Sequence, residues 1–296
     1  MNTINRPLRA RTSVPRALTG ALQWRLLLLW IAATLLCALV GALPVWNWLA
    51  SLLDHAVQAP AIAEGRAPGL LMEALTARTT PMGILSGSLL ASTLLMLLLS
   101  PLLAGATVAA ARSRAPLGFG DLLRGGVGDY GPMLRLLLWS VIPLGVAAAI
   151  LMGAIGFNEK AHEHAILATD VERGRNIALV VGGILLLLAH AGIEAGRGWL
   201  AADARLRSAF KAWWRGTRLL CRRPIAVLSA YVLPTVLALA LAAGLLALRQ
   251  RVDASDMTGF LLALLLGCAM AAALAWGKVA RLFALRALAE DAHARR

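Results

Sequence analysis

The chain has 296 residues, of which 59% are apolar and 15% are charged, whereas soluble globular proteins contain about 45–50% apolar and 25% charged residues. Its mean hydropathy is +0.74. This composition excludes an ordinary soluble domain and predicts an all-α polytopic membrane protein. The net charge of +14 would indicate nucleic acid binding in a soluble protein. In a membrane protein, a positive net charge comes mostly from basic loop residues that fix the orientation in the membrane. We therefore expect no nucleic acid partner.

Six apolar stretches are long enough to cross a bilayer, which requires about 20 residues. Each stretch should be helical, because lipid offers no hydrogen bonds to the backbone. The predicted spans cover about 26–46, 83–108, 136–157, 177–199, 224–248 and 257–277. Basic tails, residues 1–25 and 278–296, flank this 26–277 transmembrane domain. Cleavage of the first span as a signal peptide is the less favoured alternative, because its apolar run exceeds the usual length of about 7–15 residues.

The basic residues are divided unequally between the two sides of this topology. The side that holds both termini carries 22 of the 29 Lys and Arg residues and a net charge of +16, and the other side has a net charge of −2. Because positive loops stay in the cytoplasm, we expect both termini there. An arginine-rich composition with only three lysines favours a bacterial source, and therefore the inner membrane.

An internal repeat is visible when the chain is shifted by 91 residues. The shift aligns 104–125 with 195–216 without a gap and with eight identities in 22 positions. Self-similarity of this kind indicates repeated structural units. Both segments follow an even-numbered span and lead into an odd-numbered one. We therefore predict that the six spans form three parallel hairpins, the first of which is expected from topology alone.

The segment 203–223, between spans four and five, has the pattern of an amphipathic helix. Five residues recur at steps of three and four and form one face of the helix: Leu206, Phe210, Trp213, Thr217 and Leu220. A basic helix with aromatic residues is typical of the lipid headgroup region, where its cations attract anionic lipid. The predicted contacts with anionic headgroups are Lys211, Trp213, Trp214, Arg215, Arg218 and Arg222. The favoured interpretation is that this helix only anchors the topology, because positively charged loops are universal in membrane proteins.

Span four carries three ionisable residues, His190, Glu194 and Arg197, on one helix face. Such groups are costly inside a membrane and usually face the bundle interior. These residues are therefore a candidate intramembrane polar site, which could serve a proton relay or a polar substrate. The favoured interpretation is a structural pair of Glu194 and Arg197, with Arg197 reaching the interface and His190 bonded to a neighbouring helix. No other predicted span carries a central acid or base, which weighs against a relay.

The sequence lacks the usual signatures of catalysis and metal binding. It contains no Walker A, G-x-S-x-G or HExxH pattern, and its three cysteines have no CxxC partner. His162, Glu163 and His164 lie in one predicted outer loop and His55 in another, without a full ligand set. We expect no metal, no cofactor and no enzyme activity.

One part of the chain, about 190–235, resembles a family of uncharacterised bacterial inner-membrane proteins with about six spans. The resemblance lies in Glu194-Ala195-Gly196-Arg197, Arg205 to Phe210, Trp213-Trp214-Arg215-Gly216 and Arg222-Arg223-Pro224. The chain is also loosely similar to the membrane domains fused to some glycerophosphodiester phosphodiesterases. The resemblance implies an architecture and no activity. We expect a non-enzymatic component that engages anionic lipids, or a membrane or cytoplasmic protein partner. The alternative is a transporter or export component that uses the polar face of span four.

Overall fold

A computed structural model describes residues 10–53, 57, 59, 69, 72, 73, 82–113, 115–162, 168–252 and 256–295. These residues are helical apart from turns and connections, and they include no strand. The helices are α1 (Ala10–Gly20), α2 (Trp24–Leu53), α5 (Met82–Arg112), α6 (Phe119–Gly128), α7 (Tyr130–Ala161), α8 (Ala168–Ala202), α9 (Ala209–Arg222), α10 (Pro224–Arg249) and α11 (Met257–Ala294). The six long helices, α2, α5, α7, α8, α10 and α11, are long and apolar enough to cross a membrane. The predicted all-α polytopic fold is therefore confirmed.

The six long helices pair in chain order into three hairpins, α2 with α5, α7 with α8 and α10 with α11. A short helix precedes each hairpin: α1, α6 and α9, respectively. We call each short helix together with the hairpin that follows it a unit. Each short helix packs on the second long helix of another unit, so that α6 lies on α5, α9 on α8 and α1 on α11. Because α1 packs on the last helix of the chain, the contacts of the short helices link each unit to the other two.

The repeated sequence segments correspond to two helix crossings. In each crossing a short helix packs on a long helix, and glycine residues lie at the point of contact. At the α5–α6 crossing, a Cβ added to Gly105 would lie 2.7 Å from the carbonyl oxygen of Gly126. At the α8–α9 crossing, a Cβ added to Gly216 would lie 2.5 Å from the carbonyl oxygen of Gly192. Real side chains do not come this close to the backbone, so both crossings depend on glycine.

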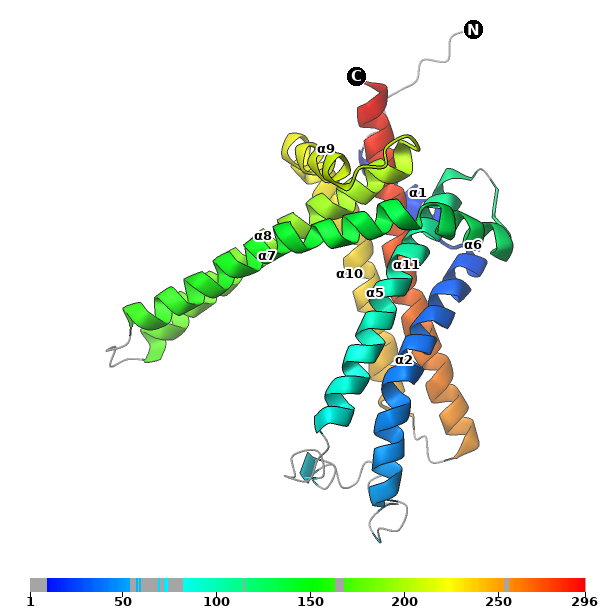
Figure 1. Cartoon of the computed structure of the whole chain (residues 1–296), viewed down its shortest axis with the longest axis vertical. Helices are drawn as coiled ribbons and strands as arrows, with labels where there is room; N and C mark the ends of the chain where they lie inside the picture. Colours follow the sequence, from blue (N-terminus) through cyan, green and yellow to red (C-terminus); the bar gives the residue numbers. More distant parts are fainter. Residues whose placement is uncertain are drawn as a thin grey trace.

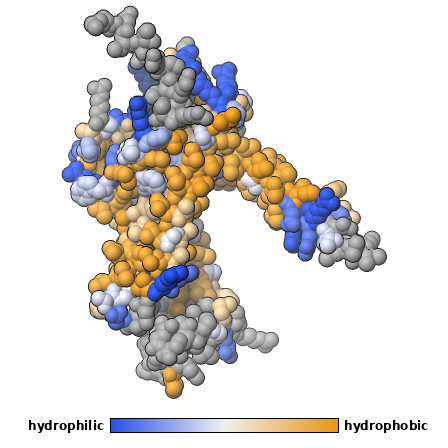
Figure 2. All heavy atoms as spheres, turned by 180° about the vertical axis from the view of Figure 1, so that it is seen from behind, coloured by the Kyte–Doolittle hydropathy of each residue, from blue (hydrophilic) through white to orange (hydrophobic). Residues whose placement is uncertain are grey.

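The hairpins meet at one end and diverge at the other. Figure 1 shows α7 and α8 leaving the bundle of α2, α5, α10 and α11 at a wide angle, with α9 and the C-terminal end of α11 at the end where the hairpins meet. The buried core lies at that end, where α5, α7, α8, α9 and α11 contribute to one cluster that includes Leu136, Trp199 and Leu282. Figure 2 shows apolar side chains covering both the diverging hairpin and the bundle. Such extensive exposed apolar surface requires lipid around it.

The ends of several helices differ from the spans expected from hydropathy. α11 is expected to end at Gly277, where the charge-free run stops, but it continues to Ala294. The second half of α11 is packed, since Leu282, Leu285 and Ala289 are all buried. Part of the 1–25 tail also forms the helix α1, whose Val14 and Ala17 pack with Leu285 and Leu288. Interhelical contacts therefore extend the folded region well beyond the apolar runs.

Candidate functional site

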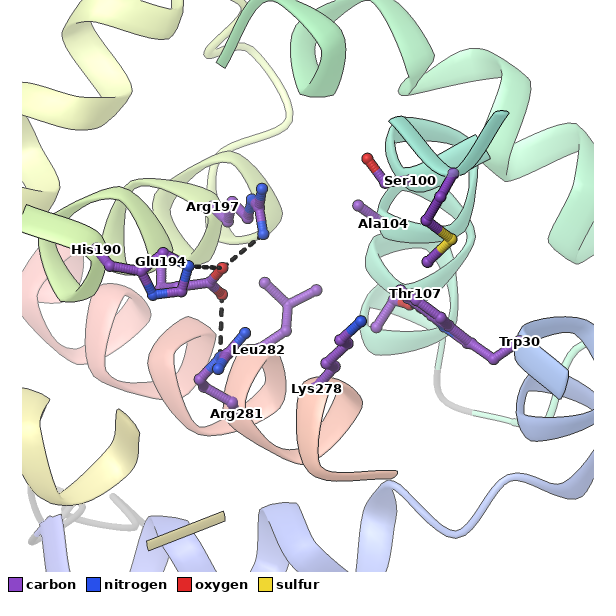
Figure 3. A pocket seen from close by; sticks show the side chains of 11 residues that line it. Trp30, Ser100, Ala104, Thr107, His190, Glu194, Arg197, Lys278, Arg281 and Leu282 are labelled. Carbon is purple, nitrogen blue, oxygen red and sulfur yellow. Dashed lines mark hydrogen bonds and ion pairs between the residues drawn. The ribbon is translucent and has the colours of Figure 1, made fainter. Parts of the chain in front are cut away.

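A polar cavity of about 230 Å³, which we call the central cavity, lies where the second long helices of the three hairpins meet. Its lining comes from α2, α5, α8 and α11: Trp30, Met96, Ser100, Ala104, Thr107, His190, Glu194, Arg197, Lys278, Arg281 and Leu282. Figure 3 shows the α8 and α11 side chains pointing toward one another, with Thr107 and Trp30 on the opposite wall. The predicted polar face of span four therefore opens onto a cavity.

Glu194 is the electrostatic centre of this cavity. Its carboxylate is buried, with 2% of the residue exposed. It accepts a hydrogen bond of 2.5 Å from Nη1 of Arg197 and one of 3.2 Å from Nε of Arg281 (Figure 3). A carboxylate loses its hydration when it is buried, and two guanidinium donors compensate for that loss. Glu194 thus joins α8 to α11 through a charged contact that neither helix could make alone.

Arg281 and His190 are both held by α10. Arg281 donates from Nη1 to Oγ1 of Thr235 at 3.3 Å, and its guanidinium lies 5.1 Å from the centre of the Tyr231 ring. His190 Nδ1 is 2.7 Å from the hydroxyl of Tyr231, and His190 Nε2 is 3.8 Å from Oε1 of Glu194. The third hairpin therefore fixes the orientation of both groups.

Lys278 is the cation of the central cavity that lacks a carboxylate partner among the described residues. Its ammonium lies 4.9 Å from the centre of the Trp30 ring, a cation–π contact. The indole of Trp30 in turn donates to Oγ1 of Thr107 at 3.4 Å. Three cations, Arg197, Lys278 and Arg281, face one carboxylate, so the cavity has a net charge of +2 when His190 is neutral.

The structure contains the contacts of the structural alternative for the span-four residues, places these residues at a cavity, and adds two residues from α11. The Glu194–Arg197 pair and the bond from His190 to a neighbouring helix are both present. The additional ionisable partners come from α11, where Lys278 and Arg281 lie beyond the predicted end of span six at Gly277. They were assigned to the C-terminal tail because they follow the last charge-free run. Their spacing of three residues, which places both on one helix face, was the available signal.

The predicted amphipathic helix is present as α9, but it begins at Ala209 and not at 203. Residues 203–208 form the turn that follows α8, and the Ser208 side chain accepts a hydrogen bond of 3.4 Å from the Lys211 backbone N–H. This serine ends the turn and starts the helix, because a hydroxyl satisfies one of the free N–H groups of the first turn.

The six predicted lipid contacts on α9 are not equivalent in the structure. Four of them are exposed: Lys211, Trp214, Arg218 and Arg222. Trp213 is partly buried, with its ring centre 5.9 Å from that of Trp139 on α7. Arg215 is held by an ion pair with Asp203 at 3.1 Å. Much of the apolar face of α9 therefore packs on protein, since the glycines of α8 allow the two helices to approach closely.

The part of the chain that the structure describes holds no candidate metal centre, and no related protein is found. Within the described residues, no group of three or more His, Cys, Asp and Glu side chains could hold a metal ion. Glu163, His164 and His55, which the sequence analysis considered, lie outside the described residues. Comparison of the chain with protein-family models, curated proteins and solved structures finds no match. The geometry of the central cavity is therefore the feature of this protein that bears on its function.

Proposed function

We propose that this chain is a non-enzymatic protein of a bacterial inner membrane that binds the phosphate-bearing headgroup of an anionic lipid in the central cavity. The single observation that carries this proposal is the net charge of +2 in a cavity lined by helices long enough to span a membrane. Uncompensated charge among membrane-spanning helices is costly, and a bound anion would offset that cost.

The cavity is accessible to a ligand. The side chains of His190 and Arg197 are 37% and 25% exposed, respectively, and Lys278 is also exposed. A guanidinium and an ammonium that face one space are suited to a phosphate group, because both donate charge-assisted hydrogen bonds to its oxygens. A volume of about 230 Å³ is below the roughly 300–1,000 Å³ typical of sites that enclose a whole small molecule. It therefore suits a headgroup better than a complete lipid.

The surroundings of the cavity favour a lipid over a soluble anion. Exposed leucines lie on the same helices, at Leu97 and Leu98 of α5, Leu187 of α8 and Leu274 of α11. In a bilayer these side chains contact acyl chains. A ligand that places its phosphate in the cavity and its chains along these leucines satisfies both environments.

The charge distribution supports an orientation with the cavity near the cytoplasmic side. The end where the hairpins meet carries α1, α9 and the C-terminal end of α11, which belong to the segments whose charges sum to +16. Positively charged segments are retained in the cytoplasm. The lipid would then come from the inner leaflet.

A transporter is the second candidate function. The observation that favours it is the divergence of α7 and α8 from the other two hairpins, since α8 carries three of the cavity residues (Figure 1). A rigid-body movement of this hairpin would change the access to the cavity. Lipid binding without movement needs only the static geometry, so it remains the first candidate.

Lys278→Gln tests the proposal, because Lys278 has no ion pair within the described residues and its loss should leave the fold intact. Anionic and zwitterionic lipids bound to the purified protein would be compared by native mass spectrometry. Loss of one charge-assisted hydrogen bond costs about 1.5–3 kcal/mol, which corresponds to roughly ten- to hundredfold weaker binding of phosphatidylglycerol. Lys160→Gln, the same change at the exposed end of α7, is the matched control. Equal retention of phosphatidylglycerol by both variants and the unmodified protein would reject the proposal.

A further inference from the structure

A second cationic cavity, which we call the arginine pocket, lies between α9 and the last turns of α11. Its volume is about 180 Å³, and it shares no lining residue with the central cavity. The lining residues are Trp199, Arg215, Arg218, Leu219, Arg222, Arg223, Ala292 and Arg295. Five of these eight residues are arginines, and no acidic residue is among them. Figure 1 shows α9 and the C-terminal end of α11 at the end of the molecule where the three hairpins meet.

Two nearby carboxylates position three of the five arginines. Asp203 accepts from Nη1 of Arg215 at 3.1 Å. Asp291 is 2.7 Å from Nη1 of Arg223 and 3.1 Å from Nη2 of Arg295, and its side chain is only 11% exposed. Since two carboxylates serve five guanidinium groups, the pocket and its immediate partners keep a net charge of +3.

The remaining two arginines, Arg218 and Arg222, have no ion pair within the described part of the chain. They lie one turn apart on α9, on the same face as Arg215. Their guanidinium groups therefore supply uncompensated donors toward the pocket that the other three arginines outline.

The floor of the pocket holds these groups in place. The ring of Trp199 is almost fully buried, and the guanidinium of Arg215 lies 5.5 Å from its centre. Burial of the Asp203 carboxylate acts to raise its pKa, but hydrogen bonds from the Arg205 backbone N–H and the Arg215 side chain outweigh this and lower the pKa. The carboxylate that orients Arg215 thus stays ionised at neutral pH.

Orientation in the membrane does not require this geometry. The positive-inside rule depends on the number of Lys and Arg residues near the span ends, and not on their convergence. Convergence of like charges raises the free energy of the fold unless an anion is present. Guanidinium groups match phosphate oxygens in pairs, because their planar fork donates two parallel hydrogen bonds.

We infer that the arginine pocket binds a phosphate group with at least two negative charges, either a soluble phosphorylated molecule or a phosphomonoester lipid headgroup at the membrane surface. Arg218 and Arg222 contact the phosphate directly. Arg215, Arg223 and Arg295 define the shape of the site and add to its potential. This inference is independent of the function proposed for the central cavity, since the two sites have no residue in common.

The test measures binding of two probes to the full-length protein. Pyrophosphate is titrated calorimetrically against the detergent-solubilised protein, and nanodiscs with and without phosphatidic acid are compared in parallel. The Arg218→Gln/Arg222→Gln variant should bind at least about tenfold more weakly to whichever probe the unmodified protein binds, because two charge-assisted bonds are lost. Arg218→Lys/Arg222→Lys, which keeps the charge and loses the fork, should have an intermediate affinity.

The matched control is Arg205→Gln/Arg207→Gln, which removes two exposed cations close in sequence that do not line the pocket. It should bind within about twofold of the unmodified protein. Binding of pyrophosphate supports the site with a soluble ligand, and binding of phosphatidic acid alone supports it with a lipid. The inference is overturned by absence of binding to both probes, or by an equal loss in the control and the Arg218→Gln/Arg222→Gln variant.

Discussion

Replacement of Glu194 by Gln tests whether a buried carboxylate organises the central cavity. The variant keeps the size of the side chain and removes its charge. It leaves the guanidinium of Arg281, which is 9% exposed, without a counter-ion. At an effective dielectric constant near 20, two charges at the 3.2 Å separation of Arg281 and Glu194 attract by at most about 5 kcal/mol.

Measured losses for a broken buried pair are about 3–5 kcal/mol. The lower end applies here, for two reasons. The Gln amide oxygen can still accept one hydrogen bond, worth about 1 kcal/mol. Arg197 is 25% exposed, so its charge can be solvated from the cavity. We therefore expect Glu194→Gln to lower the free energy of unfolding by about 3 kcal/mol.

This loss is measured by unfolding the protein in mixed micelles with increasing amounts of sodium dodecyl sulfate. Far-UV circular dichroism and the fluorescence of the nine tryptophans monitor the unfolding. Glu290→Gln is the control, because Glu290 is 47% exposed and pairs with Arg286 within one helix. Exposed pairs contribute about 0–1 kcal/mol. A Glu194→Gln/Arg281→Gln variant should recover part of the loss, because it removes the orphaned charge. Equal stability of the Glu194→Gln and Glu290→Gln variants would refute the reasoning.

Two further predictions concern helix packing and orientation. Gly216→Ala should destabilise the protein by about 1–3 kcal/mol in the same assay, because the added methyl group meets backbone atoms of α8 that cannot move aside. Gly244→Ala on α10, where nothing lies within 4 Å of the added Cβ, should change stability by less than about 1 kcal/mol. If both alanine variants behave alike, the glycine crossing is not what holds α9 on α8. In a cysteine-free background, Arg218→Cys and Lys160→Cys should react with a membrane-impermeant maleimide from opposite sides of the membrane, Arg218→Cys from the cytoplasm. Labelling of both from one side would contradict the topology.

The sequence pattern is sufficient to predict the structural features that depend on a single segment of the chain. Run length predicts the six long helices, because any apolar segment of about 20 residues must satisfy its own backbone in lipid. The recurrence of Arg and Trp at helical spacing predicts α9, and the 91-residue shift predicts a repeated unit. The aligned glycines, Gly105 with Gly196 and Gly125 with Gly216, lie at the two helix crossings of the structure.

Features that depend on two distant segments were decided by the tertiary structure. Nothing near Lys278 and Arg281 in the sequence indicates that they meet Glu194, because α11 stays helical past its apolar run only where other helices pack against it. The sequence likewise could not predict whether the apolar face of α9 contacts lipid or protein, because either environment buries apolar side chains. Charge pairing and side-chain packing act over a few ångströms between residues far apart in the chain, and only the folded arrangement of the hairpins determines which of them come within that range.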